Sequence, residues 1–459
     1  MNGQKIEKGQ KKKDPIQLSD HFGYGRLLRF TLPSISMMIF TSIYGVVDGY
    51  FVSNYAGALP FAGVNLIMPF IMLASAVGFM AGAGGNALVA KTFGEGKADE
   101  AREIFSLLVY VMIGVGLVLT LLGEILVRPI AIRLGGSGEV LEYAVRYGRI
   151  GFLTLTCFML QNLFQTFLIT AERPKLGLAI TVGAGLTNII LDFVFVKHFG
   201  WGVQGAAAAT SFSELFGGLV PLFYFALPNG SILRLGKPHR RIGCLLRICG
   251  NGISELLSNV SMSIVNMVYN YQLLRFAGAF GVAAYGVIMY INFIFLSVFF
   301  GFCNGCAPVV GFHYGAEDES ELRGLLKKGI VITSTIGFLM MTLAQGSARL
   351  LTGAYVGYEP QLFELAVRAF RICALSFLFS GINIFGSSFF TALNNGKISA
   401  CISGARVMVF QIVGVLILPL LFGVDGIWFA TVGAEIGALA VTAFCLNHFF
   451  LRKNRIDTQ

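Results

Sequence analysis

The chain has 459 residues, of which 55% are apolar and 13% are charged. Soluble domains average about 45–50% apolar and about 25% charged residues, so this composition excludes a soluble multidomain enzyme, a disordered chain and a disulfide scaffold. The formal charge of +10 is concentrated in a basic amino-terminal tail. We interpret this tail as a signal of membrane topology, and no nucleic-acid partner is expected. Its lysines are Lys5, Lys8, Lys11, Lys12 and Lys13.

Twelve apolar runs follow along the chain, each about 20 residues or longer, which is the length of a helix that crosses about 30 Å of hydrocarbon. The first run starts behind a long charged lead and is too long for the core of a cleaved signal peptide. We therefore predict an all-α polytopic membrane protein. The predicted spans are 30–52, 61–86, 104–127, 148–170, 176–197, 203–227, 248–274, 282–311, 328–347, 365–391, 398–421 and 427–451.

Positive charge is distributed unevenly over the segments between these spans. With a cytoplasmic amino terminus, the inside segments hold 24 of the 34 Lys and Arg residues, the outside segments hold 9, and Arg406 lies within a span. Because Lys and Arg favour cytoplasmic loops, both termini are predicted to be cytoplasmic. The loop after the third span is an exception that weakens this pattern without reversing it, since it carries Arg128, Arg133, Arg146 and Arg149.

The sequence repeats itself once. Residues 55–102 align without gaps on residues 276–323 at an offset of 221, and further matches continue at nearly the same shift. Six spans per half is an even number, so both halves enter the membrane from the same side and their pseudo-twofold axis runs along the membrane normal. We predict two six-helix lobes around a central cleft. The expected segments are a basic tail 1–29, a first lobe 30–227, a linker 228–247, a second lobe 248–451 and a tail 452–459.

Few ionisable side chains lie within the predicted spans, where each costs about 2.5–3.5 kcal/mol on insertion scales. Glu214 and Glu435 are repeat mates, and whether they, Glu255 and Arg406 are functional or structural stays open. Asp48 and Asp192 are different, because at the repeat offset they fall on Tyr269 and on Val413 or Gly414. Acid chemistry at these two positions is therefore specific to the first lobe.

Asp48 and Asp192 are predicted to lie at the same depth in the membrane. Asp48 is about four residues, roughly 6 Å, from the outer end of its span, and Asp192 is about five residues from the outer end of the fifth span. Asn188 lies one turn deeper than Asp192, and Thr210 of the sixth span faces the same level. Two close carboxylates cannot both ionise cheaply, so the set can take up a proton; its hard oxygen ligands also suit Na⁺. A satisfied polar network that only pins the helices together is the structural alternative.

Four motifs point to a known family: Leu32-Pro33, Val47-Asp48, Gly94 and the run Asn188-Ile189-Ile190-Leu191-Asp192. On these motifs the chain resembles the multidrug and toxic compound extrusion (MATE) family of secondary transporters, and in particular its prokaryotic DinF-like and MepA-like branch. The likeness covers nearly the whole chain, and the usual Thr after the first-span Asp is replaced by Gly49. The resemblance implies a coupling-cation site of Tyr44, Asp48, Asn188, Asp192 and Thr210, with Na⁺ possible at the last four.

The resemblance implies export of small amphipathic cationic drugs or dyes in exchange for H⁺ or Na⁺, by a monomer in the cell membrane of a bacterium or archaeon. No enzyme activity and no cofactor beyond the coupling ion are expected. Contact with membrane lipid follows from the spans. The side chains expected to line a substrate cavity are Gln161, Gln165, Met37, Met38, Phe40, Met68, Phe158 and Glu255.

The sequence favours three other functions less. A lipid-linked saccharide flippase of the same superfamily would need cationic side chains in the cleft to hold a diphosphate, and only Arg406 lies within a span. A membrane-embedded hydrolase would use Asp48 and Asp192 as an acid pair, yet neither HExxH nor GxGD surrounds them. A channel is disfavoured because a two-lobe repeat with one acidic lobe is typical of a carrier.

Overall fold

The computed structural model describes residues 16–238, 243–357 and 359–456, and over these residues the regular secondary structure is entirely helical. Residues 1–15, which hold the basic lysines, lie outside the described residues. Residues 239–242 of the predicted linker and 457–459 of the predicted carboxyl-terminal tail also lie outside them.

The first half of the chain forms seven α-helices. The chain turns sharply at Gly57, between the first two helices, because glycine tolerates the positive φ of 101° found there. Pro174 starts one helix at a position where its missing N–H is harmless. The helices are α1 Tyr24–Phe51, α2 Ala58–Gly94, α3 Ala98–Arg133, α4 Gly138–Leu153, α5 Leu155–Thr170, α6 Pro174–Asp192 and α7 Gly202–Ala226, with π-helical turns η1 Val52–Ala56 and η2 Phe193–His198.

The second half repeats this order. The Asp318 and Asn395 side chains each accept a bond from a backbone N–H in the first turn of their helix, which satisfies part of the free amino end. The helices are α8 Gly243–Gly315, α9 Glu319–Val356, α10 Pro360–Ala374, α11 Phe377–Ala392, α12 Gly396–Gly404, α13 Gln411–Phe422 and α14 Val424–Ile456, with the π-helical turn η3 Ala405–Phe410 between α12 and α13.

These helices make twelve membrane spans, which confirms the predicted fold class. Nine of the described helices are long and apolar enough to cross a membrane, and the bent pairs α4–α5 (55°) and α10–α11 (49°) each add one. The 73-residue α8 contributes two spans, because its backbone leaves the helical region at Gly278 (φ 63°, ψ −154°). A straight helix of that length would measure about 110 Å, far more than a bilayer core.

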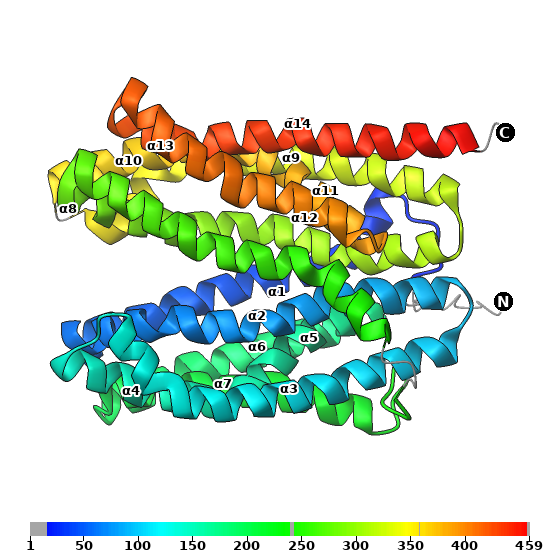
Figure 1. Cartoon of the computed structure of the whole chain (residues 1–459), viewed down its shortest axis with the longest axis horizontal. Coiled ribbons are helices and arrows are strands. Elements are labelled where there is room, and N and C mark those ends of the chain that lie inside the picture. The colour runs from blue at the N-terminus through cyan, green and yellow to red at the C-terminus, as the bar shows by residue number, and fades with distance from the viewer. Residues whose placement is uncertain (1–15, 239–242, 358, 457–459) are drawn as a thin grey trace, which may run out of the picture.

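Figure 1 shows α1–α7 and most of α8–α14 as two bundles stacked against each other, with both ends of the described chain at the same end of the molecule. We call this the tail end. It also holds the turns that follow α2, α5, α8 and α11. Helices α1 and α2 of the first half pack against α8 of the second, so these three form most of the seam between the bundles.

Glycines let the two bundles touch backbone to backbone at the tail end. A Cβ placed on Gly94 would lie 1.9 Å from the carbonyl oxygen of Phe312, and one on Gly315 would lie 2.0 Å from that of Lys91. The two contacts are exchanged by the repeat offset of 221, because Gly94 corresponds to Gly315 and Lys91 corresponds to Phe312. This pair is therefore related by the pseudo-twofold axis.

Further contacts of the same kind extend the seam. A Cβ on Gly84 would lie 2.1 Å from the carbonyl oxygen of Ile248, and one on Gly252 would lie 2.0 Å from that of Met80. The Asn394 side chain of the second half donates to the carbonyl oxygen of Ala87 in the first, at 3.1 Å. Because these residues lie in the tail-side halves of their spans, the tail end is closed in this structure.

A short amino-terminal segment, residues 16–23, ties the two bundles together across the tail end. The backbone N–H of Leu18 donates to Glu172 of the first half at 2.8 Å, and that of Phe22 donates to Glu321 of the second half at 2.9 Å. Both apolar side chains are fully buried, and the Phe22 ring packs edge-on against Phe30. We call this segment the strap.

We predict that Gly94→Ala destabilises the protein, because the new methyl group would overlap the Phe312 carbonyl and overpacking costs about 1–3 kcal/mol. The measurement is the thermal midpoint of the purified protein in detergent. Gly114→Ala is the matched control, since a Cβ at Gly114 has open space around it. A Gly94→Ala midpoint equal to that of the control would contradict the close contact.

We also predict that Phe22→Ala releases the strap, because truncating a fully buried Phe removes about 3–5 kcal/mol of packing. Limited proteolysis followed by mass spectrometry should show faster cleavage near Arg26. Tyr24→Ala is the control, because the Tyr24 side chain is exposed. Equal cleavage rates for the two variants would argue that the strap is not held by Phe22.

Candidate cation site in the first half

Polar side chains from three helices meet near the end of the first bundle that lies opposite the tail end. The hydroxyl of Thr210 on α7 donates to Oδ1 of Asp48 on α1 at 3.2 Å. Nδ2 of Asn188 on α6 donates to the same Thr210 hydroxyl at 3.4 Å. The structure thus brings together three of the residues that the sequence places at one depth.

Asp192 completes this group and is fully buried. Its carboxyl group faces that of Asp48. Neither carboxylate oxygen of Asp192 has a hydrogen-bond partner among the described residues, and the same holds for Oδ1 of Asn188. Buried polar atoms are almost always bonded. Three unsatisfied oxygens at one place therefore form a site that a proton or a cation would complete.

The unsatisfied oxygens are hard ligands. Two carboxylates, an amide oxygen and a hydroxyl suit Na⁺ and suit a proton shared between carboxyl groups equally well. Over the described residues, no group of three or more His, Cys, Asp or Glu side chains is arranged so that it could hold a metal ion. The donor set therefore fits a light monovalent ion better than a transition metal, which prefers nitrogen or sulfur ligands.

Both helices that carry the aspartates become π-helical just after them. η1 begins four residues after Asp48, and η2 begins directly after Asp192. Single π-helical turns are frequent at functional sites, because the wider turn leaves backbone bonds less constrained. Lys197 of η2 lies over the ring of Tyr55 in η1, 5.3 Å from its centroid. The two π-helical turns are therefore linked just beyond the carboxylate pair.

The second half keeps the geometry of this site and replaces its acid groups. Tyr269, the repeat mate of Asp48, bonds Thr431, the mate of Thr210, through their hydroxyls at 2.9 Å. The Tyr269 ring stacks on Tyr285 with centroids 5.0 Å apart. Two equivalent positions thus hold an acid–hydroxyl contact in one bundle and a neutral hydroxyl pair in the other.

One side chain near the site was missed by sequence reasoning. Tyr147 on α4 interacts with Thr210 and lies within electrostatic range of Asp48, Asp192 and Glu214. Its repeat mate is Ala369. A polar side chain whose repeat mate is apolar is the sequence signal that could have pointed to Tyr147.

Glu214 on α7, which the sequence left unassigned, also lies close to Asp48. Its Oε2 accepts a bond from the Thr154 hydroxyl at 2.6 Å. Tyr44, the fifth predicted site residue, lies within electrostatic range of both Glu214 and Asp48 and interacts with Gln161 and Thr41.

The other unassigned charged residues lie in the second half. Arg406 forms an ion pair with Glu435 at 3.2 Å, and Glu435 also accepts a bond from Asn383 at 2.7 Å. Glu255, proposed from sequence for the substrate cavity, is half-buried on α8 within the field of Arg406. Arg406 is therefore neutralised within its own bundle.

The residues predicted for a substrate cavity are dispersed. Gln161 and Gln165 line one small pocket with about 10 Å³ of free volume, room for about one water molecule. Gln165 lies 3.5 Å from the hydroxyls of Thr41 and Thr181. In this conformation the pocket is too small for a drug-sized molecule.

The remaining cavity candidates pack between helices. The Met37 sulfur would lie 3.1 Å from a Cβ on Gly177, so that methionine fills the α1–α6 contact. The Phe40 ring lies 6.2 Å from that of Tyr44. Three others are placed by a single neighbour or by burial alone: Met38 contacts Asn304, Met68 contacts Tyr147, and Phe158 is half-buried.

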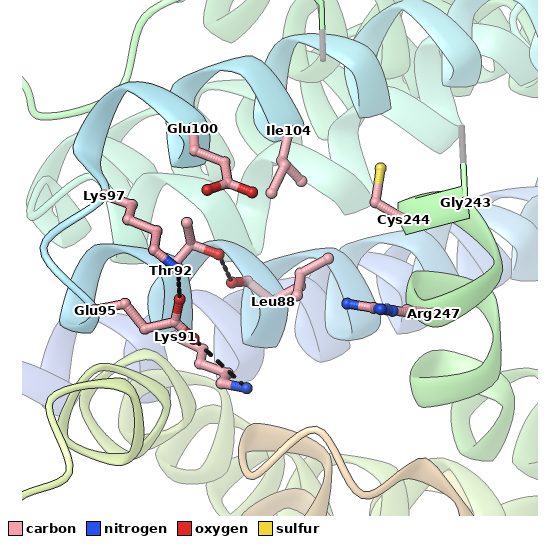
Figure 2. Close-up of a pocket in the computed structure, with 10 residues that line it drawn as sticks. All are labelled: Leu88, Lys91, Thr92, Glu95, Lys97, Glu100, Ile104, Gly243, Cys244 and Arg247. Carbon is pink, nitrogen blue, oxygen red and sulfur yellow. Dashed lines mark hydrogen bonds and ion pairs between the residues drawn. The ribbon is translucent and has the colours of Figure 1, made fainter. Parts of the chain in front are cut away.

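A larger pocket of about 420 Å³ lies at the tail end, between α2, α3 and the start of α8. Figure 2 shows its lining of mixed charge, with Lys91 and Lys97 both directed at Glu95. Lys97 holds the pKa of the Glu95 carboxyl below its usual range through a hydrogen bond. The pocket carries acidic and basic side chains in near balance and lies at the other end of the bundle from Asp48.

Comparison with known families identifies this architecture. The MatE family model matches the chain twice, over residues 33–194 and 256–417, once in each half. The chain belongs to the MatE family. Two curated proteins that this chain resembles are the multidrug export proteins MepA of Staphylococcus saprophyticus and Staphylococcus aureus, and each is 23% identical to this chain. Their alignments cover 90% of this chain and 91% of each relative.

Solved structures show the same fold. A MATE protein in complex with MaL6 and an outward-facing MATE family transporter of the MOP superfamily each superpose with a TM-score of 0.89 at 21% identity. The first alignment covers 95% of this chain and 97% of the other, and the second covers 98% and 99%. A MOP superfamily transporter from Pyrococcus furiosus, described as having a binding pocket of reverse polarity, superposes at 0.87 with 21% identity over 95% of this chain and 98% of its own.

We predict that the ion which occupies this site raises the thermal midpoint of the wild-type protein, and that Asp192→Asn removes the rise. An ion present at one hundred times its Kd would raise the free energy of unfolding by about 2.7 kcal/mol. The midpoint is measured against Na⁺ at constant ionic strength and, separately, against pH. Asp99→Asn is the control, because the Asp99 side chain is 94% exposed. A wild-type midpoint that follows neither ion would contradict an ion site here.

Proposed function

We propose that this protein is a secondary active antiporter that exports amphipathic organic cations in exchange for H⁺ or Na⁺ by alternating access. The observation that supports this most is the pairing of half-buried Asp48 with fully buried Asp192, whose two carboxylate oxygens lack partners among the described residues. A carboxylate in a membrane bundle costs several kcal/mol and marks an ion or proton pathway. Its confinement to one half supports a carrier that uses two similar lobes for different tasks.

The proposed coupling starts when an ion enters the site. A proton on either carboxyl group lets it donate to the other, and Na⁺ would draw all the oxygens inward. Either event ties Asp48 on α1 more closely to Asp192 on α6. The adjacent turns η1 and η2 are the parts of these helices that can adjust. Movement of α1 reaches the second bundle directly, because α1 packs on α8.

Alternating access then requires the tail end to open. We assign the tail end to the cytoplasm, because the predicted inside segments carry most of the Lys and Arg residues. In the present conformation the glycine contacts and the strap hold this end shut. A cleft between the bundles would form there when both sets of contacts separate, in the cell membrane of a bacterium or archaeon. A monomer suffices, since one chain supplies both lobes.

The driving force depends on stoichiometry. One proton moving down 100 mV releases about 2.3 kcal/mol, and each pH unit adds about 1.4 kcal/mol. Exchange of one H⁺ for one monovalent cation moves no net charge, so the ion's concentration gradient alone would drive it. Two ions per substrate cation would make transport depend on voltage. A voltage dependence of export would therefore report the number of coupled ions.

The proposed substrates rest on the relatives and on composition. The MepA relatives are named multidrug export proteins. This chain has 42 Phe and 14 Met residues, which offer polarizable and adaptable surfaces to organic cations. The alternative, a lipid-linked saccharide flippase, needs free cationic side chains for a diphosphate. Arg406, the basic residue that lies farthest from the ends of a predicted span, is paired with Glu435, which argues against this alternative.

The test is efflux of ethidium from proteoliposomes under a pH gradient and a Na⁺ gradient imposed separately. We predict that one gradient drives efflux by the wild type, and that Asp48→Asn and Asp192→Asn each reduce the driven rate at least tenfold. Both variants should elute from a sizing column as folded protein. Asp99→Asn serves again as the exposed control.

Two results would contradict the proposal. Wild-type efflux by either aspartate variant would remove the coupling role of the pair. Absence of driven efflux of any organic cation by the wild type would remove the antiport function itself.

A further inference from the structure

The repeat leaves one carboxylate in the first half without the partner that its mate has. Glu435 is bonded by Arg406 and Asn383. Its mate Glu214 accepts a single hydrogen bond, from Thr154, and no described Lys or Arg pairs with it. The position that corresponds to Arg406 in the first half is Gly185. The same acidic position therefore has a cationic partner in one bundle and none among the described residues in the other.

Glu214 lies near the middle of the membrane. It is twelve residues after Gly202 at the start of α7, which places it about 18 Å along a span that crosses about 30 Å. Transporters of this general architecture bind substrate near the midplane, at the interface of their repeats. Asp48 and Asp192, by contrast, lie close to one end of their spans. Glu214 is therefore a separate anionic position, deeper than the proposed ion site.

The bond to Thr154 fixes Glu214 at the bend between α4 and α5. Thr154 is the residue at which the two helices meet. On the adjacent turn of α7, the Ser211 hydroxyl donates to the carbonyl oxygen of Ile150, one of the carbonyls near the bend. Only Oε2 of Glu214 is used in this way. Its second oxygen remains available to a ligand.

The groups around Glu214 suit an organic cation. The titratable side chains that face it are Asp48 and Tyr44 of α1, Tyr147 of α4 and Cys157 of α5. None of them is cationic. The Phe40 ring lies beside Tyr44, and aromatic faces attract ammonium and phosphonium groups. Acid and aromatic groups are combined here without a basic side chain.

We propose that Glu214 binds the positive charge of the transported organic cation. This inference rests on the proposed antiport function and assigns the substrate charge to a residue distinct from the Asp48–Asp192 pair. A single monovalent organic cation fits one unpaired carboxylate. The Gln161 side chain, which interacts with Tyr44, supplies a neutral polar contact on α5.

The proximity of Glu214 to Asp48 couples the two sites. A cation held at Glu214 favours the ionised form of Asp48, and a proton or Na⁺ at Asp48 reduces the negative potential that attracts the cation. By linkage, each ligand weakens binding of the other by the same factor. This competition is what an exchanger needs, since substrate and coupling ion then occupy the protein alternately.

The test is equilibrium binding of tetraphenylphosphonium to the full-length protein in lipid nanodiscs, measured by isothermal titration calorimetry. Glu214→Gln is close to isosteric and keeps an oxygen for Thr154, yet removes the charge. We expect its Kd to rise at least tenfold. Glu214→Asp retains the charge and should stay within about threefold of wild type. Glu435→Gln, the repeat-matched control, should stay within about twofold.

A second readout separates this inference from the proposed function. Wild-type Kd should increase as pH falls through the titration of the Asp48–Asp192 pair or as Na⁺ is added, and Glu214→Gln should flatten this dependence. Wild-type affinity in Glu214→Gln would overturn the inference, as would equal weakening in all three variants or a Glu214→Gln protein that does not fold. If wild type exports organic cations while Glu214→Gln binds normally, the inference alone fails and the antiport function stands.

Discussion

The arrangement depends on the cost of placing two carboxyl groups together where water is scarce. Asp48 and Asp192 face each other inside a helical bundle, and neither oxygen of Asp192 has a donor among the residues that the structure describes. Such a pair is stable only when a proton or a cation occupies it. Under the proposed function, the protein around it would therefore have two electrostatic states, with and without an ion. α1 carries one member of the pair and also packs on the opposite bundle, so these states reach the seam.

Two bundles of similar shape serve different chemistry. Asp48 with Thr210 and Tyr269 with Thr431 are equivalent contacts at the repeat offset, one acidic and one neutral. Glu435 is neutralised by Arg406, whereas no Lys or Arg of the described residues pairs with Glu214. In both comparisons the shape is kept and the charge is changed. The packing of the two bundles follows the repeat symmetry, whereas the proposed ligand sites depend on side chains that differ between the halves.

The sequence predicted the spans well, because a helix in lipid needs a long apolar run and leaves few alternatives. It also placed Asp48, Asn188 and Thr210 at one depth, since a fixed rise per residue converts sequence position into height. It did not predict the π-helical turns, which depend on neighbours packed against η1 and η2. Tyr147 was missed because α4 carries several charged and aromatic side chains, so one Tyr among them gives no distinct signal. The strap joins Phe22 to Glu321, 299 residues away, a distance that no local pattern spans.

The paired glycine contacts make the tail-end closure all-or-none. The contact of Gly94 with Phe312 and that of Gly315 with Lys91 lie on opposite sides of the pseudo-twofold axis. A rigid rotation that moves one bundle away from the other at the tail end would therefore separate both contacts together. Partial leakage at a single contact would require bending within a helix. A carrier closed by such a pair of contacts is not open to both compartments at once. An ion gradient then does not dissipate through the protein between transport cycles.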